Sequence, residues 1–328
     1  MIEYFLGQLQ LSPQDVQTVN LNSEFKINEK KFIYFTIPIN QVTNFQEKLA
    51  FVHTNLSQDQ FVVFRFETIQ GRIRRIQNKQ WRIVSILIVS SEFLLHRVIP
   101  RILLFKFIYK KLTKSRIRVI SKAEALGRIV YAGFKIHAVE NSEKHTYAIF
   151  KPSNADFRNQ KPSFGPLYSM PRIGKNGKII KVYKIRTMHP YSEFLHDFMI
   201  RKHGYGTLGK PKNDFRVTNW GKFLRKFWID EIPQIFNVLK GDMKLVGLRP
   251  VSQVYFNGLS EELQKMRIKF KPGCIPPYVA FNEKSSRDSV LLAEEKYIAL
   301  KNKNPYTTDI GLFFKALYFI LIKKQRGS

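Results

Sequence analysis

Apolar and polar positions along the first part of the chain predict strands and helices in alternation. FIYFTIPIN (32–40) and FVVFRFET (61–68) are rich in aromatic and β-branched residues, which is typical of strands. QVTNFQEKLAFVHTNL (41–56) lies between them and has helical spacing. Residues 121–140 predict a helix that turns at Gly133 into a strand, and residues 145–153 predict its hairpin partner. This alternation indicates an α/β layer.

The end of this layer, a helix followed by a strand and a hairpin strand, resembles the tail of a class I methyltransferase fold. No glycine-rich cofactor loop precedes it, so S-adenosylmethionine binding is not expected. We therefore interpret residues 1–155 as a Rossmann-like, degenerate methyltransferase-like α/β scaffold domain. Residues 156–328 are predicted to form an α+β catalytic domain, so the fold class is α/β plus α+β.

Two segments combine apolar residues with clustered basic residues. Residues 93–122 contain nine Lys or Arg and no Asp or Glu, with Pro100 among aliphatic and aromatic side chains. The run IGLFFKALYFIL (310–321) is followed by Lys323 and Lys324. Helices of this composition lie in a membrane interface, although a helix packed on the α/β layer would read similarly. We predict interfacial segments near 92–122 and 310–324.

The charge of the chain predicts a polyanionic partner. With 55 Lys and Arg against 25 Asp and Glu, the formal net charge is +30, which suits nucleic acid, an anionic lipid surface or a phosphate-bearing substrate. The longest uncharged apolar stretch near the middle, 83–91, is much shorter than the roughly 20 residues of a spanning helix. Among these partners, charge alone does not decide.

A hairpin is predicted in the catalytic half. Asn176 and Gly177 separate two apolar-rich runs, and this pair favours a type I′ turn in which both residues have positive φ. Lys184 and Arg186 follow in the second strand, two positions apart, and so share one face. Two cations on one face suit a diphosphate, although a solvated strand would look the same.

The stretch GKFLRKFWIDEIPQIFNVLKGDMKLVGLRP (221–250) carries the candidate chemistry. Ile232, Ile235, Phe236 and Leu239 have the spacing of one helix face, Pro233 suits a first turn and Gly241 suits a helix end. Asp230 and Glu231 are therefore expected at the helix N-terminus, where free N–H groups would lower a carboxylate pKa. A simple helix cap would explain one acid better than two.

Arg225 and Arg249 bracket this helix in the sequence. Guanidinium groups make bidentate contacts with phosphate oxygens, so four candidate cations (Lys184, Arg186, Arg225 and Arg249) could converge on a phosphoryl group. A carboxylate can attack phosphorus as a nucleophile, and phosphoryl transfer usually requires Mg²⁺. The residues alone make phosphoryl transfer plausible.

The segments GPLYSMPRIGKNGK, KVYKIRTM, DFRVTNWGKFLRKFWIDEIPQIFNVLKGDM, LVGLRP and KPG closely resemble the bacterial sugar transferase family, the monotopic phosphoglycosyl transferases. The resemblance covers about residues 160–280. It implies that Asp230 attacks a UDP-sugar and expels UMP, that polyprenyl phosphate then accepts the phosphosugar, and that Glu231 helps to bind Mg²⁺. It also implies that Arg186 and Arg249 contact phosphates.

The sequence departs from the family pattern in three places. Residues 140–164 are polar where the family has an apolar helix, which moves the expected membrane anchor to 92–112. Leu248 stands where the family has a proline, which loosens the main chain beside Arg249. Pro276 and Pro277 replace a glycine-containing turn, which bears on donor or acceptor preference.

The preferred interpretation is a UDP-sugar:polyprenyl-phosphate sugar-1-phosphate transferase that initiates bacterial surface glycan assembly. It would act at the cytoplasmic face of the inner membrane as a monotopic or peripheral protein without a spanning helix, on an anionic membrane surface, with a homodimer left open. Two alternatives are a basic nucleic-acid-binding protein, for which no recognition motif is present, and a non-catalytic partner in a polysaccharide assembly complex.

Overall fold

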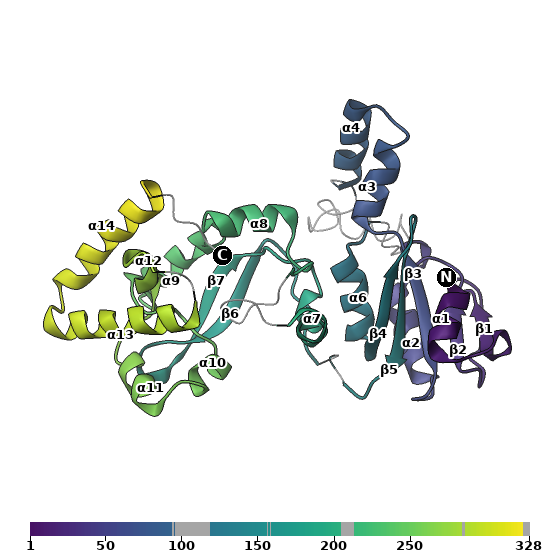
Figure 1. The fold of residues 1–328 in the computed structure, drawn as a ribbon, viewed down its shortest axis with the longest axis horizontal. Coiled ribbons are helices and arrows are strands. Elements are labelled where there is room, and N and C mark those ends of the chain that lie inside the picture. The colour runs from purple at the N-terminus through teal and green to yellow at the C-terminus, as the bar shows by residue number, and fades with distance from the viewer. Residues whose placement is uncertain are drawn as a thin grey trace. The chain divides into compact units, whose positions relative to one another are not determined.

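The computed structural model describes residues 1–93, 95, 119–155, 157, 159–204, 213–283 and 286–323. The chain forms two compact units (Figure 1). Unit 1 comprises Met1–Ser163 and His189–Phe198, and unit 2 comprises Phe164–Met188 and Met199–Ser328. The mixture of a sheet with many helices agrees with the predicted α/β class.

A five-stranded sheet forms the centre of unit 1. Its strands are β1 (Val16–Val19), β2 (Phe32–Phe35), β3 (Phe61–Phe66), β4 (Phe134–Asn141) and β5 (Thr146–Pro152), in the order β1-β2-β3-β5-β4. The first three are parallel, and β5 is antiparallel to both of its neighbours. The strands predicted within 32–40, 61–68 and 145–153 are confirmed, with shorter bounds, and Gly133 has the positive φ (103°) that its turn requires.

Successive side chains of a strand point to opposite sides, so this sheet has two faces to bury. Both are covered. On one face, Phe5 and Leu6 of α1 (Ile2–Leu9) pack with Phe32 and Tyr34. On the other, the ring of Phe45 from α2 (Phe45–Thr54) packs edge-on against Phe64. Helix α6 (Lys122–Tyr131) contacts β4, and its buried aliphatic side chains complete a phenylalanine-rich core. Short 3-10 turns η1 (Pro13–Asp15) and η2 (Ile39–Gln41) connect the outer elements.

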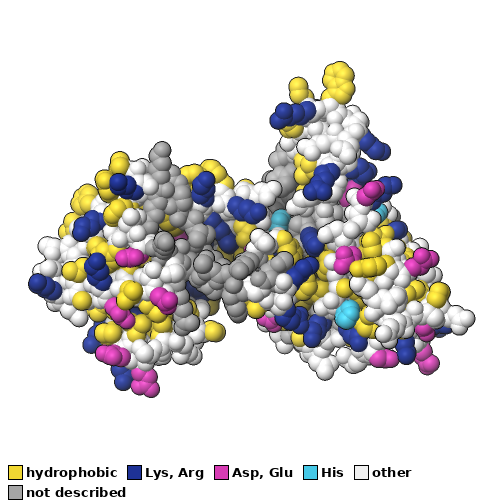
Figure 2. All heavy atoms as spheres, viewed as in Figure 1, with side chains coloured by type: hydrophobic (Ala, Val, Ile, Leu, Met, Phe, Trp, Pro, Cys, Tyr) yellow, Lys and Arg dark blue, Asp and Glu magenta, His cyan; other side chains and the backbone are white. Residues whose placement is uncertain are grey.

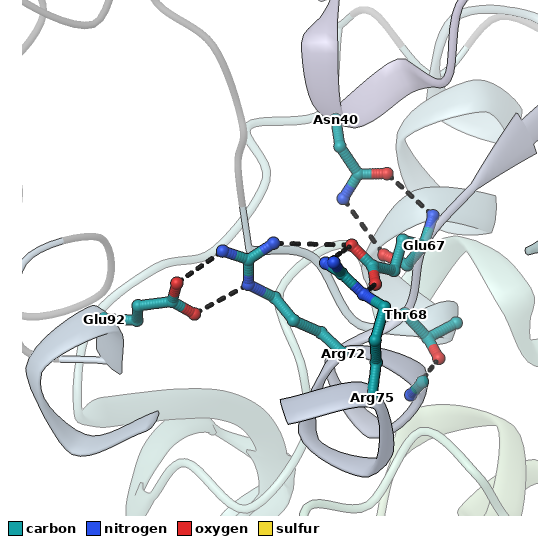
Figure 3. A network of polar contacts seen from close by, with 7 residues as sticks. Asn40, Glu67, Thr68, Arg72, Arg75 and Glu92 are labelled. Carbon is teal, nitrogen blue, oxygen red and sulfur yellow. Dashed lines mark hydrogen bonds and ion pairs between the residues drawn. The ribbon is translucent and has the colours of Figure 1, made fainter. Parts of the chain in front are cut away.

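A hairpin of two helices, α3 (Ile69–Gln77) and α4 (Arg82–Phe93), follows β3 and projects from the sheet (Figure 1). Ion pairs fix its base (Figure 3): the Arg72 guanidinium binds Glu92 and Glu67, and Arg75 Nε donates to Glu67 at 2.8 Å. The Asn40 side chain in turn binds the main chain of Glu67 at 2.8 and 3.0 Å. The network therefore ties both helices to the end of β3.

The segment His189–Phe198 folds with unit 1, although the residues on either side of it belong to unit 2. It contains η6 (Ser192–Leu195) and the start of α7 (His196–His203). Its aromatic side chains pack against Tyr131 of α6, and Arg128 lies 4.4 Å from the Tyr191 ring centroid. Gly127 allows this approach, since an added Cβ would lie 2.2 Å from the Tyr191 carbonyl oxygen.

Unit 2 begins with the predicted hairpin, β6 (Leu167–Ile173) and β7 (Ile179–Ile185), which are antiparallel. Asn176 and Gly177, in the 3-10 turn η5 (Lys175–Gly177), both have positive φ, and the Lys178 N–H donates to the Lys175 carbonyl at 3.2 Å. The turn prediction is confirmed. Asn176 and Gly177 supply the mirror-image geometry that suits twisted strands.

The remainder of unit 2 is a helical layer around a short parallel pair, β8 (Lys244–Val246) and β9 (Gly273–Ile275). Its core contains Leu248, Leu263, Val279, Tyr297 and Ala316. The helices are α8 (Asn219–Lys226), α9 (Ile235–Leu239), α10 (Gln253–Asn257), α11 (Glu261–Arg267), α12 (Pro277–Ala280), α13 (Arg287–Lys303) and α14 (Thr307–Leu321). Asp309 anchors α14 by accepting hydrogen bonds from Lys244 and Tyr297 at 2.8 Å each.

The two predicted membrane segments differ in what the structure says of them. Most of 92–122 lies outside the described residues. The C-terminal segment is helical in α14. Across the described part of the chain, every helix is too short or too polar to cross a bilayer.

Candidate active site

Asp230 and Glu231 lie in the first turn of η8 (Ile229–Gln234), a 3-10 helix that continues into α9. The prediction that the two acids lie at a helix N-terminus is confirmed, although the helix begins with 3-10 rather than α-helical winding. Trp228, with φ 54°, reverses the chain, and the Glu231 N–H donates to the Trp228 carbonyl at 3.0 Å. Pro233 has no N–H with which to form an α-helical bond back to residue 229, which favours the tighter 3-10 winding here.

The Asp230 side chain is buried, and the residue is only 6% exposed. Burial raises the pKa of Asp230, and the Glu231 charge raises it further, while Lys184 and Arg225 act in the opposite direction. The predicted lowering of this pKa was therefore wrong, because loss of hydration outweighs the nearby cations and N–H groups. The carboxyl is nevertheless close enough to two cations to be stabilised when it is charged.

Glu231 is partly exposed and forms an ion pair with Lys184 of β7, whose Nζ lies 2.6 Å from Glu231 Oε1. The side-chain amide of Gln234 donates to the other Glu231 oxygen at 3.2 Å. The structure thus joins Lys184, predicted from strand spacing, to the acidic pair predicted from a separate segment. Gln234 was not predicted.

Arg225, near the end of α8, is partly buried and lies within electrostatic reach of Asp230. Its Nε donates to Thr187 Oγ1 at 2.9 Å. Burial lowers the pKa of Arg225, whereas Asp230 and Asp214 raise it. The Thr218 cap of α8 also contacts Thr187, since its hydroxyl donates to the Thr187 carbonyl at 3.0 Å. Thr187 therefore orients the arginine and the helix that carries it.

Arg186 and Arg249 occupy other parts of the surroundings. Arg186 Nε donates to the Gly165 carbonyl at 2.9 Å, and its guanidinium lies 5.2 Å from the Tyr168 ring centroid. Arg249 follows β8 and lowers the pKa of Tyr278, a pKa that burial raises and that the Glu231 charge also raises. Tyr278, which was not predicted, therefore lies within electrostatic reach of both Arg249 and Glu231.

Asn237 joins the acidic segment to the strand that carries Lys184. It is fully buried, its Nδ2 donates to the Lys181 carbonyl at 2.7 Å, and its Oδ1 accepts from the Tyr183 N–H at 3.1 Å. Nothing in the sequence distinguished this residue from an ordinary polar position of a helix. Burial raises the pKa of the Cys274 thiol to about 11. A thiol of that pKa is not a nucleophile at neutral pH, so Cys274 has a structural role.

The apolar residues predicted for one face of this helix lie at the surface. The exposed apolar side chains of α8 and of the η8–α9 segment are Trp220, Phe223, Phe227, Ile232, Ile235, Phe236 and Leu239. The buried contacts are made instead by polar Asn237 and by Val238, which packs with Val182. The acidic pair is thus flanked in the chain by water-exposed apolar residues.

The side chains around Glu231 suit a hard cation that also binds substrate phosphates. Mg²⁺ usually takes only one or two protein carboxylates and completes its shell with water and phosphate oxygens. Glu231 supplies a carboxylate, and the buried amide oxygen of Gln234 has no hydrogen-bond partner among the described residues. Within those same residues, no three His, Cys, Asp or Glu side chains form a self-sufficient metal cluster. A metal shared with substrate fits this set.

The profile of the bacterial sugar transferase family matches residues 157–322, half of the chain. The chain belongs to the bacterial sugar transferase family. The match includes Lys184, Arg225, Asp230, Glu231 and Arg249, the residues assembled above. The family resemblance expected from the sequence is confirmed.

Several curated relatives share this region. The chain is 35% identical over 162 residues to the galactosyl transferase CpsE of Streptococcus agalactiae, which covers 48% of this chain and 35% of the relative. It is 38% identical over 166 residues to the UDP-N-acetylgalactosamine-undecaprenyl-phosphate N-acetylgalactosaminephosphotransferase of Aeromonas hydrophila, covering 48% and 36%. It is 42% identical over 107 residues to the undecaprenyl-phosphate galactose phosphotransferase of Salmonella typhimurium, covering 31% and 21%. The matches thus span about a third or less of each relative.

Proposed function

We propose that this chain transfers a sugar-1-phosphate from a UDP-sugar to polyprenyl phosphate and so initiates a bacterial surface glycan, such as an exopolysaccharide, a capsule or lipopolysaccharide. The observation that carries the proposal is the buried Asp230 carboxylate beside Lys184, Glu231 and Arg225, within the region that matches the family. The names of the relatives, which specify UDP-sugars and undecaprenyl phosphate, support the donor and acceptor classes.

The first step of the proposed reaction is attack by an Asp230 oxygen on the β-phosphorus of the UDP-sugar. A bond forms between that oxygen and phosphorus, and the bond from the β-phosphorus to the bridging oxygen breaks. The bridging oxygen leaves with its electron pair as part of UMP. Burial supports this role, because a poorly hydrated carboxylate has less water to displace before it attacks.

The second step returns Asp230 to its starting form. A phosphate oxygen of the polyprenyl phosphate attacks the phosphosugar, the acyl-phosphate bond breaks and the carboxylate is released. Two steps through a covalent phosphosugar-aspartate replace one direct transfer between two anions. Both steps use the same carboxyl group, so a single substitution at Asp230 would abolish both.

The surrounding cations would stabilise the charge of the diphosphate. Lys184 is in direct contact with Glu231, and Arg225, oriented by Thr187, is within electrostatic reach of both acids. Arg186 and Arg249 would bind other phosphate oxygens of the diphosphate. Charge stabilisation by preorganised groups is the main contribution that proteins make to phosphoryl transfer.

Mg²⁺ would be held by Glu231, with the Gln234 amide oxygen as a further donor. When bound, it would neutralise phosphate charge and help UMP to leave. Lys184, which is paired with Glu231, would contact a phosphate oxygen of the substrate.

An anionic bilayer is the proposed location, and helix α4 supports it. The side of α4 that faces inward carries Ser85, which is fully buried, and Glu92, which is paired with Arg72. The outward side carries Ile83, Ile86 and Leu87, all exposed. A helix with three exposed aliphatic residues on its outward side suits an apolar surrounding.

Trp81, at the tip of the α3–α4 hairpin, is 86% exposed and lies between Lys79 and Arg82 in the sequence. Tryptophan and basic residues favour the headgroup region of a bilayer. Helix α14 has a second outward apolar stripe, formed by Ile310, Phe314, Tyr318 and Leu321. Basic side chains are spread between apolar ones on the face drawn in Figure 2. These features support a monotopic or peripheral position on the cytoplasmic leaflet, where anionic lipids gather.

The sheet of unit 1 supports a Rossmann-like scaffold, which is a further part of the proposal. Three parallel strands in chain order are followed by β5, inserted antiparallel between β3 and β4. The helix, strand and hairpin strand expected at the end of the unit correspond to α6, β4 and β5.

The deciding experiment measures UMP release from a panel of UDP-sugars, with polyprenyl phosphate and Mg²⁺, by the purified chain in detergent. We expect release with at least one sugar and its loss in Asp230→Asn. Asp197→Asn, at an exposed aspartate, is the matched control and should retain full activity. Without acceptor, mass spectrometry should find a phosphosugar on the peptide containing Asp230. Full activity of Asp230→Asn would refute the proposal.

A further inference from the structure

The loop that carries Arg249 is held through its main-chain carbonyl groups. This loop, 247–251, joins β8 to the start of α10. The Leu248 carbonyl accepts from the Gly273 N–H at 2.9 Å, and the Val251 carbonyl accepts from the Ile173 N–H at 3.0 Å. The carbonyl of Arg249 itself is bound by a side chain, Nη2 of Arg267, at 2.7 Å. Three separate elements therefore fix three nearby carbonyls.

Arg267 is an unusual donor for this purpose, because it is a buried cation. The residue is 6% exposed at the end of α11, and its Nη1 donates to the carboxylate of Glu294 in α13, which is 1% exposed. A buried arginine–carboxylate pair contributes little net stability compared with well-packed apolar side chains. The pair therefore invites an explanation other than stability.

The contact with Arg249 supplies that explanation. Glu294 neutralises the guanidinium and fixes its plane, so that the second terminal nitrogen points at the Arg249 carbonyl. Pro250 fixes its own φ and limits the conformations of Arg249, and the contact with Arg267 further fixes the Arg249 carbonyl. Leu248, before it, has no ring to fix φ and is held by burial of its side chain.

We infer that Arg267, held by Glu294, is a positioning residue that fixes the main chain at Arg249 and so aims the Arg249 guanidinium at a phosphate of the nucleotide-sugar. The inference rests on the proposed role of Arg249 in phosphate binding. Arg267 itself does not touch substrate in this scheme. Misplacing a phosphate-binding group by about 1 Å can cost on the order of a hundredfold in rate.

A double-mutant cycle tests the inference with UMP release in detergent as the readout. Arg267→Met combined with Glu294→Leu replaces the ion pair by apolar side chains of similar size, which buried pairs often tolerate. We expect kcat/KM to fall roughly ten- to a hundredfold in the natural background. In an Arg249→Ala background, the same exchange should change kcat/KM less than about twofold, because the side chain that it positions is gone.

The outcomes separate the inference from the function on which it rests. Equal losses in the two backgrounds would show that the pair acts on stability alone and would overturn the inference while leaving the transferase proposal intact. If Arg249→Ala by itself left kcat/KM unchanged, Arg249 would have no role in phosphate binding and the inference would fail with it. The dependence of activity on Asp230 would persist. Loss of activity in Asp230→Asn is independent of both results.

An exposed ion pair on the same helix provides the control. Lys265→Met with Glu261→Leu removes the pair on the outer side of α11, where both side chains face water, and should leave kcat/KM unchanged in both backgrounds. If the double variant of the buried pair melts at a much lower temperature, Arg267→Lys takes its place in the cycle. Lysine keeps the charge beside Glu294 but lacks the second donor in a fixed plane. The fall in kcat/KM that Arg267→Lys causes should likewise disappear in the Arg249→Ala background.

Discussion

The side-chain oxygen of Asn237 accepts a hydrogen bond from the main-chain N–H of Tyr183 at 3.1 Å, while its amide nitrogen donates to the Lys181 carbonyl. One buried side chain thus behaves as a further strand residue along β7. It sets the distance between the helix after Glu231 and the strand that carries Lys184. The active-site ion pair depends on this junction.

Replacing Asn237 should therefore disturb activity as well as stability. Asn237→Ala leaves the Lys181 carbonyl and the Tyr183 N–H without this partner, which costs about 1–3 kcal/mol for each group that water does not reach. We expect a lower melting temperature and a fall in kcat for UMP release of at least tenfold. Asn257→Ala, at an exposed residue of α10, is the control. If Asn237→Ala lowered the melting temperature but left kcat unchanged, Asn237 would support the fold without positioning Lys184 and Glu231.

Removing the charge of Lys184 should shift the acid limb of the pH–rate profile. Lys184 lowers the pKa of Asp230, and attack requires the carboxylate, so Lys184→Met should raise this pKa and move the acid limb of kcat/KM to higher pH. Lys181→Met, at an exposed lysine of the same strand, should leave the limb in place. An unmoved or lowered limb in Lys184→Met would contradict the assignment of Asp230 as the group that must be charged.

Asp230→Asn should separate activity from stability. Since burial raises the pKa of Asp230, its charged form is less favourable in the folded than in the unfolded chain. The fold is therefore destabilised at pH values above the unfolded pKa, and a neutral amide removes this cost. We expect UMP release to fall at least about a thousandfold, with a melting temperature at pH 7 no lower than that of the parent. A clearly lower melting temperature would mean that the charge supports the fold.

Two glycines of unit 1 should respond oppositely to alanine. Gly127→Ala places a methyl group 2.2 Å from the Tyr191 carbonyl oxygen and should destabilise the protein by about 1–3 kcal/mol. Gly7→Ala, in helix α1 with nothing within 4 Å of the new methyl group, should stabilise it by about 0.5–1 kcal/mol. Thermal unfolding of both variants measures the difference. Equal effects would show that α6 and the Tyr191 segment are not in close contact.

The outward face of α4 should govern vesicle binding. Ile86→Asn with Leu87→Asn removes apolar area that the bilayer would cover, worth about 1.5 kcal/mol or more for each residue. We expect at least tenfold weaker co-sedimentation with anionic vesicles, and unchanged UMP release in detergent. Phe51→Asn, at an exposed residue of α2, is the control. Unchanged vesicle binding would exclude α4 as a contact with lipid.

Local signals in the sequence predicted local structure well. Asn176 and Gly177 determine their own turn, because the required positive φ is a property of those two residues. The order of helix, Gly133, strand and hairpin strand likewise survives in α6, β4 and β5. The 3-10 winding of η8 depends on two residues together: Pro233, which has no N–H, and Trp228, which has a left-handed conformation. The spacing of apolar residues did not predict this winding.

The sequence named three residues that the structure brings together, but it did not predict their electrostatics. Asp230, Glu231 and Lys184 come together as expected, yet the direction of the Asp230 pKa follows from burial that no stretch of sequence reveals. Asn237 and Arg267 were missed for a related reason. Each acts through main-chain groups of a distant segment, Lys181 and Tyr183 in one case and Arg249 in the other, and main-chain partners leave no mark in the residue pattern.

The packing of residues 189–198 with the N-terminal unit has a practical consequence for any shortened form of this chain. A gene fragment begun at the family boundary would keep Tyr191, Phe194 and Leu195 but discard α6, against which Tyr191 and Phe194 pack. These apolar side chains would then be exposed to water and would favour aggregation. The region matched by the family profile thus includes a stretch, 189–198, that packs with the N-terminal unit.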